Sequence, residues 1–161
     1  KALGAEVWIS DISQGKLDIA KTFGIDGTIL NSSKEAFDNG VAKITESNGF
    51  DVTIEAVGLP STFIDCIDAA CFGGHMVLVG VGKRNADFNF TLLQKKELNV
   101  YGSRNALKKD FIELIDIVKR GDVPLDKIIT NTYSFDEAQR AFSDFDANTG
   151  DMLKVVIDFT K

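Results

Sequence analysis

Residues that bind metals or form disulfides are scarce in this sequence. Its 161 residues include two cysteines, Cys66 and Cys71, and a single histidine, His75. Two cysteines cannot build a disulfide framework, so we expect a reducing, cytoplasmic environment. Because a zinc site usually needs a full set of ligands at characteristic spacings, no metal site is expected within this segment.

Long apolar runs and an excess of basic residues are also absent. No apolar run approaches the ~18 residues that cross a bilayer, so we expect no membrane partner. The net charge is -6, which argues against a nucleic-acid partner, because phosphate backbones favour basic patches. Only two prolines occur, and no low-complexity tract or long linker divides the chain. Residues 1–161 are therefore expected to belong to one domain.

Patterns typical of strands alternate with patterns typical of helices along the whole chain. The run HMVLVGVG at 75–82 is almost continuously apolar, as in a parallel strand covered on both faces. Two capping boxes, Ser32 with Glu35 and Ser134 with Glu137, are expected to open helices. This order predicts an α/β fold with a doubly wound, Rossmann-like parallel sheet. We expect strands at 7–10, 28–30, 50–58, 75–82, 98–103, 129–135 and 152–159, and helices at 14–23, 32–48, 60–71, 91–97, 107–120 and 134–145.

Three of the predicted strands end in groups that suit a nucleotide. Ligands of doubly wound folds collect at the carboxyl ends of the strands, which here carry Asp11, Val57-Gly58 and the glycine pair of 80–82. A carboxylate such as Asp11 can accept two hydrogen bonds from a ribose diol and repels a 2′-phosphate, which selects NAD over NADP. Lys16 could reach the adenosine ribose or the pyrophosphate. Alternatively, Asp11 caps a turn and Lys16 is an ordinary surface residue.

The glycine-rich loop that should precede such an acid is missing from the sequence. The dinucleotide fingerprint lies ~20 residues upstream of the acid, whereas ten residues precede Asp11. The opening KALGA resembles the tail of a helix that stops at Gly4, and Gly73-Gly74 is expected to end the helix at 60–71. GVGKRN at 80–85 follows the wrong strand and does not match G-x-G-x-x-G. We therefore expect a Rossmann-like domain without its first strand and glycine-rich loop.

Taken together, the motifs resemble the zinc-containing medium-chain dehydrogenases, and most closely their polyol and sugar-acid branch, the sorbitol and galactonate type. The similarity extends through essentially all of this chain and corresponds to the C-terminal part of that family's chain. It rests on the order and spacing of KALGAEVWISDIS, KLDIAKTFGIDGTIL, FDVTIEAVG, GGHMVLVGVG, ELNVYGS, YSFDEAQRAF and KVVIDF.

The resemblance implies a role in cofactor binding for each matching position. Asp11 matches the acid that binds the adenosine ribose, and Lys16 matches a basic residue beside it. The loop at Val57 and Gly58 matches the segment that passes the adenine side of the cofactor. The positions implied at the nicotinamide end are Val79, Gly80 and Val81, which lie beside the nicotinamide and its ribose, and Ser103 and Arg104. Arg104 could equally be a plain surface charge.

The family also implies what the intact protein does. NAD would accept a hydride from a secondary alcohol of a polyol or sugar acid, with zinc as the Lewis acid. The zinc ligands would lie outside this segment, so we expect the segment alone to be inactive. The strand at 98–103 would pair with another subunit in a homodimer or homotetramer. Two alternatives remain open: a non-catalytic nucleotide-binding or interaction module, and an S-adenosylmethionine-binding, methyltransferase-like domain.

Overall fold

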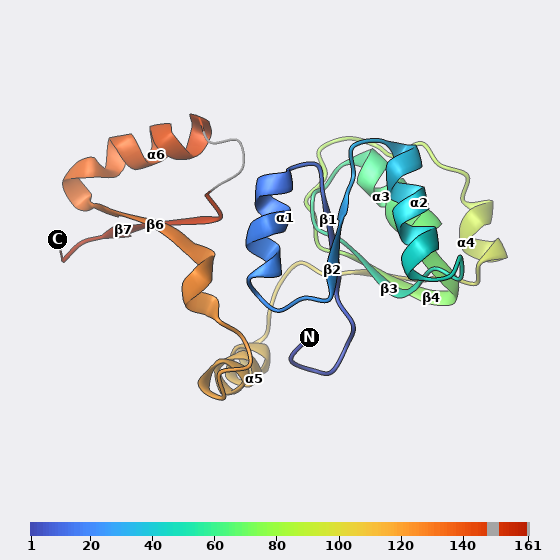
Figure 1. Ribbon diagram of the computed structural model, residues 1–161, viewed down its shortest axis with the longest axis horizontal. Coiled ribbons are helices and arrows are strands. Elements are labelled where there is room, and N and C mark those ends of the chain that lie inside the picture. The colour runs from blue at the N-terminus through green and yellow to red at the C-terminus, as the bar shows by residue number, and fades with distance from the viewer. Residues whose placement is uncertain (148–151, 161) are drawn as a thin grey trace. The chain divides into compact units, whose positions relative to one another are not determined.

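Seven strands and six α-helices alternate along residues 1–147 and 152–160, the part of the chain that the computed structural model describes (Figure 1). The chain forms two compact units, residues 1–31 with 107–161 and residues 32–106, and each is described separately below. The strands are β1 (Trp8–Asp11), β2 (Gly27–Leu30), β3 (Phe50–Glu55), β4 (Ala70–Leu78), β5 (Asn99–Gly102), β6 (Ile129–Ser134) and β7 (Lys154–Asp158). The helices are α1 (Gln14–Lys21), α2 (Lys34–Ile44), α3 (Pro60–Ala69), α4 (Thr91–Lys95), α5 (Lys108–Lys119) and α6 (Ala138–Ala147), with short 3₁₀ helices η1 (Leu125–Ile128) and η2 (Phe135–Glu137).

The opening β1–α1–β2 segment forms one parallel pair joined by a helix. Trp8 pairs with Gly27, and Asp11 pairs with Leu30. A Cβ atom at Gly27 would lie 2.2 Å from the Trp8 ring, so only glycine leaves room for the indole at this point. Leu17 of α1 is buried, which holds the helix against the two strands. The pairing places Asp11 at the carboxyl end of β1.

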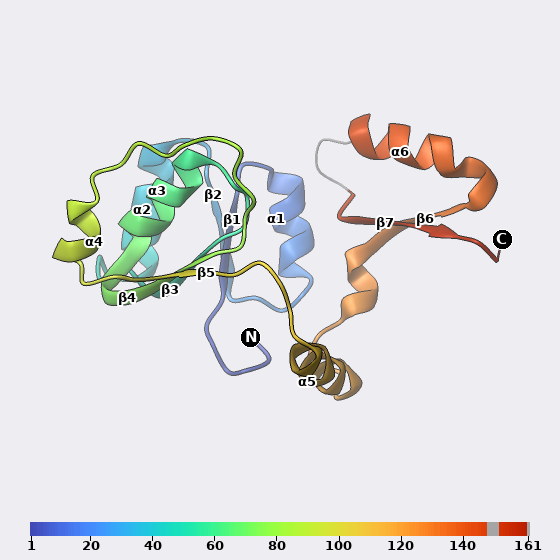
Figure 2. The same cartoon turned by 180° about the vertical axis from the view of Figure 1, so that it is seen from behind.

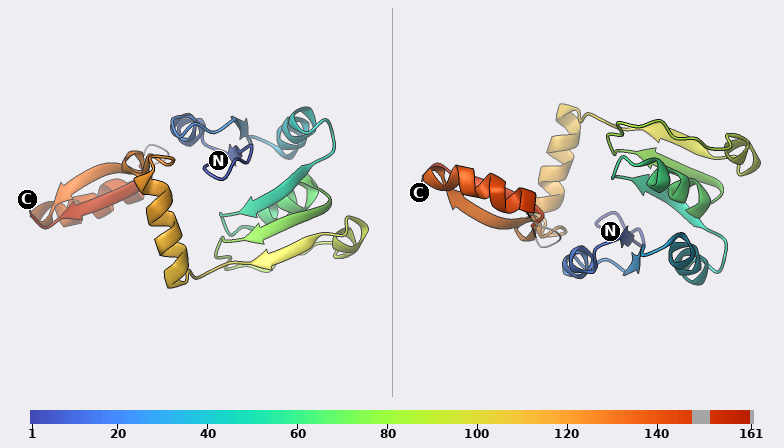
Figure 3. Two further views of the ribbon diagram at one scale, coloured as in Figure 1. Left: turned by 90° about the horizontal axis from the view of Figure 1, so that it is seen from below. Right: turned by 90° about the horizontal axis from the view of Figure 1, so that it is seen from above.

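The second unit contains a three-stranded parallel sheet in the order β3-β4-β5 (Figures 2 and 3). Thr53 of β3 pairs with Met76 of β4, and both side chains are buried on the face that α3 covers. The Thr53 hydroxyl donates to the main-chain oxygen of Cys66 in α3. Ile67 of α3 is also fully buried. This packing aligns the carboxyl ends of the three strands at one end of the sheet, which is called the carboxyl edge below.

The C-terminal strands β6 and β7 form a separate parallel pair connected through α6. The predicted capping box is confirmed, because the Ser134 main-chain N–H and hydroxyl both lie within hydrogen-bond distance of Glu137 Oε2. Tyr133, on β6, is buried, and its hydroxyl donates to Asp144 of α6 over 2.9 Å. These contacts fix α6 on its two strands.

The parallel α/β class is confirmed, but the described strands form three separate sheets instead of one. β1 and β3 each have a single neighbouring strand within the described residues. No helix among the described residues is long and apolar enough to cross a membrane.

Two local predictions are wrong. The cap of α2 is Ser33, whose hydroxyl accepts from the Ala36 N–H, and Ser32 lies outside the helix. Gly73-Gly74 does not end the helix before it but lies inside β4, which already starts at Ala70. The register shifts there from Phe50↔Ala70 to Val52↔His75, so residues 71–74 form a bulge that glycine accommodates.

The predicted helix tail at the start of the chain is also wrong. Residues 1–5 form no helix. The Gly4 N–H donates to the Lys1 oxygen in a turn instead, and Gly4 has a φ of 88°. The Asp26 carboxylate accepts from the Val7 N–H and from the Lys1 ammonium, and these contacts tie this turn to the start of β2.

Candidate cofactor-binding site

The loops that follow β3 and β4 touch at the carboxyl edge of the sheet. Gly58 has a φ of 84°, and a Cβ atom there would lie 2.7 Å from the Val81 carbonyl carbon. A Cβ atom at Gly80 would lie 2.3 Å from the Gly58 nitrogen. Both positions therefore need glycine, because any side chain would separate the two loops. The structure thus brings together Val57-Gly58 and Gly80-Val81, as the sequence predicted.

Apolar side chains next to these glycines are exposed. Val57 is 62% exposed and Val81 is 65% exposed, and Val79 is also on the surface. Exposed β-branched side chains at a strand edge are suited to contact a flat ring. This edge therefore offers an apolar contact surface carried by tightly packed backbone.

The end of β5 lies beside the end of β4. The Ser103 N–H donates to the Leu78 oxygen over 2.8 Å, which continues the ladder one residue beyond β5. Ser103 and Arg104 are both exposed. Ser103 therefore lies at the same edge as Val79, and Arg104 follows it directly in the chain.

Glu55 is a site residue that the sequence analysis missed. It ends β3, is 3% exposed, and its carboxylate accepts from the N–H groups of Val57 and Gly58 and from the Thr62 hydroxyl. Burial alone would raise its pKa, but the hydrogen bonds from Thr62, Gly58 and Val57 outweigh it and hold the pKa below the ordinary value. The available signal was an acid inside the otherwise apolar run VTIEAVG.

Asp11 and Lys16 belong to the other unit. Asp11 is half-buried, and its Oδ1 accepts from the Ser13 N–H over 2.8 Å, while Ser13 caps α1 through the Lys16 N–H. Within residues 1–147 and 152–160, no hydrogen bond reaches Asp11 Oδ2. Asp11 therefore caps its turn with Oδ1, as the alternative interpretation predicted, and Oδ2 can still accept a hydrogen bond from a ligand. Lys16 is exposed on the first turn of α1.

The two cysteines and the histidine lie in α3 and β4. Burial, reinforced by the negative charges of Glu55 and Asp65, raises the pKa of Cys66 to about 12. Cys71 lies in β4 and not in the helix that holds Cys66, which corrects the prediction of a shared helix. His75 is exposed on β4, and its ring lies 5.8 Å from that of Tyr101.

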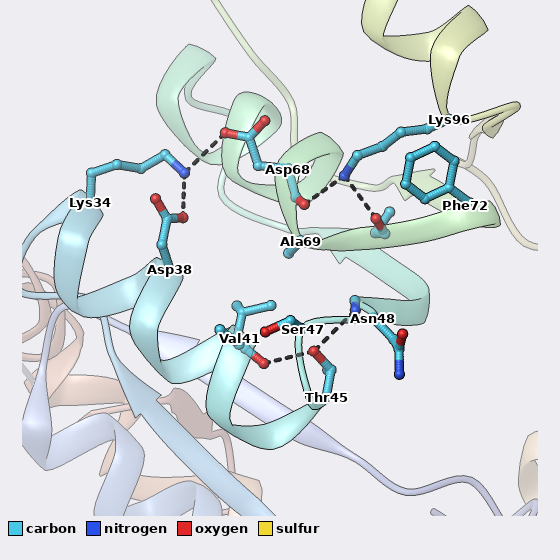
Figure 4. Close-up of a pocket in the computed structure, with 13 residues that line it drawn as sticks. Lys34, Asp38, Val41, Thr45, Ser47, Asn48, Asp68, Ala69, Phe72 and Lys96 are labelled. Carbon is cyan, nitrogen blue, oxygen red and sulfur yellow. Dashed lines mark hydrogen bonds and ion pairs between the residues drawn. The ribbon is translucent and has the colours of Figure 1, made fainter.

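A pocket of about 390 Å³ lies between α2 and α3, at the opposite end of the strands from the candidate site (Figure 4). Lys34 forms ion pairs there with Asp38 and Asp68. Lys96 donates to main-chain oxygens at the end of α3, including that of Ala70. Lys34 is therefore paired with acids of this pocket and Lys96 with main-chain carbonyl groups, which indicates a structural role.

Comparison with known proteins adds a family to this geometry. A family profile described as zinc-binding dehydrogenase matches residues 1–120. The chain belongs to the zinc-binding dehydrogenase family. Sorbitol dehydrogenase 1 of Saccharomyces cerevisiae is 32% identical over 168 residues, which cover 98% of this chain and 46% of that protein. D-xylulose reductase A of Aspergillus niger is 33% identical over 154 residues, with 93% and 43% covered.

Solved structures of two alcohol dehydrogenases share this fold. An Escherichia coli CFT073 alcohol dehydrogenase in complex with NADH superposes with a TM-score of 0.84 at 26% identity, covering 96% of this chain and 44% of that one. Benzyl alcohol dehydrogenase from Acinetobacter calcoaceticus gives a TM-score of 0.83 at 26% identity, with 96% and 43% covered. This family member therefore spans less than half the length of these relatives.

Proposed function

We propose that this chain is the cofactor-binding part of an NAD-dependent, zinc-dependent alcohol, polyol or sugar-acid dehydrogenase. The observation that carries the proposal is the edge where Gly58 and Gly80 bring two strand ends into contact beneath exposed Val57 and Val81. Ligands of doubly wound folds collect at this edge. Within the proposal, residues 1–161 are part of a Rossmann-like NAD-binding domain with β7 as its closing strand.

Each candidate residue has a distinct task in this proposal. Asp11 accepts hydrogen bonds from the adenosine ribose through the oxygen that Ser13 leaves available, and Lys16 lies beside it. Val57 and Gly58 contact the adenine side of the cofactor. The residues proposed to contact the nicotinamide end are Val79, Gly80, Val81, Ser103 and Arg104. When bound, NAD supplies the hydride acceptor; the residues of this chain bind and orient it and exclude water from its apolar face.

Zinc has no counterpart among the residues that the structure describes. No group of three or more His, Cys, Asp or Glu side chains within the described ranges could hold a metal ion. The residues present therefore do not fit the metal, and no step through zinc is assigned to them. In the proposal, a different part of a longer protein supplies the ligands.

The names of the relatives support a class of substrate by analogy. Sorbitol dehydrogenase and D-xylulose reductase among the relatives support a polyol, sugar-acid or related secondary alcohol as substrate. We further propose a cytoplasmic homodimer or homotetramer that pairs through the strand at 98–103. β5 is one of the two edge strands of its sheet within the described residues, and Val100 and Tyr101 on it are exposed, which supports pairing of this edge with a second copy.

An activity screen on the full-length protein that carries this sequence tests the proposal. Purified protein would be offered polyols, sugar acids and simple alcohols with NAD or NADP, and formation of the reduced cofactor would be followed by absorbance. NAD-dependent oxidation that is abolished by a zinc chelator and restored by zinc is the expected result. NADH binding without turnover would favour a nucleotide-binding module, and binding of S-adenosylmethionine would favour the methyltransferase-like alternative.

A further inference from the structure

Glu55 connects the two loops of the candidate site through different atoms. Its side-chain Oε1 accepts from the Val57 N–H over 2.9 Å and from the Gly58 N–H over 2.8 Å. Its main-chain oxygen accepts from the N–H groups of Val79 and Gly80 over 2.8 and 2.9 Å. One residue therefore bonds to the loop after β3 and to the end of β4.

The carboxylate lies inside the edge and not on its surface. Glu55 is 3% exposed, and a Cβ atom at Gly80 would lie 2.3 Å from its Oε2. Glutamate is seldom fully buried unless it is paired. Here the Thr62 hydroxyl, 2.7 Å from Oε1, completes the set of donors from the first turn of α3.

The hydrogen bonds of Glu55 determine whether the loop at the start of α3 can bind an anion. The N–H groups of a loop entering a helix form a ready site for an anion. In this protein the Glu55 carboxylate takes those of Val57 and Gly58. A phosphate of a bound ligand cannot use these groups, and their role is to hold the loop.

We propose that Glu55 is a positioning residue, whose carboxylate holds the Val57-Gly58 loop against Gly80-Val81 so that both valines present a rigid surface to the cofactor. The inference rests on the proposed function, because it assigns the purpose of the fixed loop. Without the charge of the carboxylate, the three hydrogen bonds that hold the loop would weaken. The Val57 surface would then have to be ordered when the cofactor binds, which lowers affinity.

Neutralising the carboxylate in the full-length protein tests the inference. Glu55→Gln keeps the size of the side chain, and Glu35→Gln is the matched control, because Glu35 is exposed on α2. We expect Glu55→Gln to weaken NADH binding by about tenfold, in line with the strength of charge-assisted hydrogen bonds. Amide hydrogen exchange should rise at residues 56–59 and stay unchanged at 50–54. The control should change neither quantity.

The outcomes separate the inference from the proposed function. Wild-type protein that fails to bind NADH would overturn the proposed function itself. If the wild type binds NADH and folded Glu55→Gln binds it with the same affinity, Glu55 does not position the loop for the cofactor. The inference is then wrong, and Glu55 has a purely structural role. If Glu55→Gln does not fold, Thr62→Val removes a single donor and is expected to weaken NADH binding about threefold. Unchanged affinity in folded Thr62→Val would then overturn the inference.

Discussion

The ammonium of Lys96 lies 2.7 Å from the main-chain oxygen of Asp68, at the carboxyl end of α3. The same nitrogen donates to the oxygens of Ile67 over 2.9 Å and Ala70 over 2.8 Å. The last carbonyl groups of a helix lack intrahelical partners and carry partial negative charge. Lys96 thus closes α3 from a position 26 residues beyond Ala70.

Removal of the Lys96 ammonium should therefore destabilise the protein. We expect Lys96→Met to lower the free energy of unfolding by about 1–3 kcal/mol, because buried carbonyl groups lose a charged donor. Lys95→Met is the matched control, since Lys95 is exposed, and should stay within about 0.5 kcal/mol of the wild type. Urea denaturation measures both, and equal stability of the two variants would contradict a capping role.

The corrected start of α2 gives a second prediction. The Ser33 hydroxyl accepts from the Ala36 N–H over 3.1 Å, whereas Ser32 lies outside the helix. Ser33→Ala should cost about 1 kcal/mol of unfolding free energy, and Ser32→Ala should cost little. Thermal unfolding of the two variants side by side decides between the caps. A larger loss in Ser32→Ala would restore the original sequence prediction.

The raised pKa of Cys66 predicts an inert thiol. Burial and the charges of Glu55 and Asp65 raise the pKa of Cys66 to about 12. The thiolate, which is the reactive form, is therefore scarce at neutral and mildly alkaline pH. In a Cys71→Ser variant of residues 1–161, Cys66 is the only thiol, and it should resist a thiol reagent at pH ~8 until denaturant is added. Rapid labelling of the folded variant would show that the thiol is accessible.

Local patterns in the sequence predicted most of the elements. The apolar spacing at 107–120 gave α5 (Lys108–Lys119) almost to the residue. The loops at Val57-Gly58 and Gly80-Val81 could be placed together, because parallel strands deliver their carboxyl ends to one edge. The glycine pair of 73–74 misled the prediction, because a bulge and a helix stop demand the same backbone freedom.

Contacts between distant positions could not be predicted. Lys96 caps a helix that ends at Ala69, and nothing near Lys96 in the sequence marks that partner. Glu55 is an acid in a mainly apolar strand, and the apolar pattern alone does not predict that its carboxylate is buried. Its donors at 57, 58 and 62 become evident only when the turn into α3 is folded.

Cofactor preference depends on a single charge in this account. Asp11 Oδ1 accepts from the Ser13 N–H, a bond that an asparagine oxygen can also accept. Asp11→Asn therefore keeps the turn and removes the charge that repels a 2′-phosphate. Asp11→Ser shortens the side chain as well and should also relax the preference for NAD over NADP.

Ribose binding by Asp11 is tested most directly by the cofactor preference of the full-length protein. The quantity is the ratio of kcat/KM for NAD to that for NADP, compared between the wild type and Asp11→Asn. Asp18→Asn serves as the control, because Asp18 is an exposed acid on α1. If Asp11 binds the ribose, the ratio should be at least about tenfold lower in Asp11→Asn, equivalent to about 1.4 kcal/mol, and unchanged in the control. An unchanged ratio in Asp11→Asn would show that Asp11 only caps its turn, and would contradict the ribose assignment.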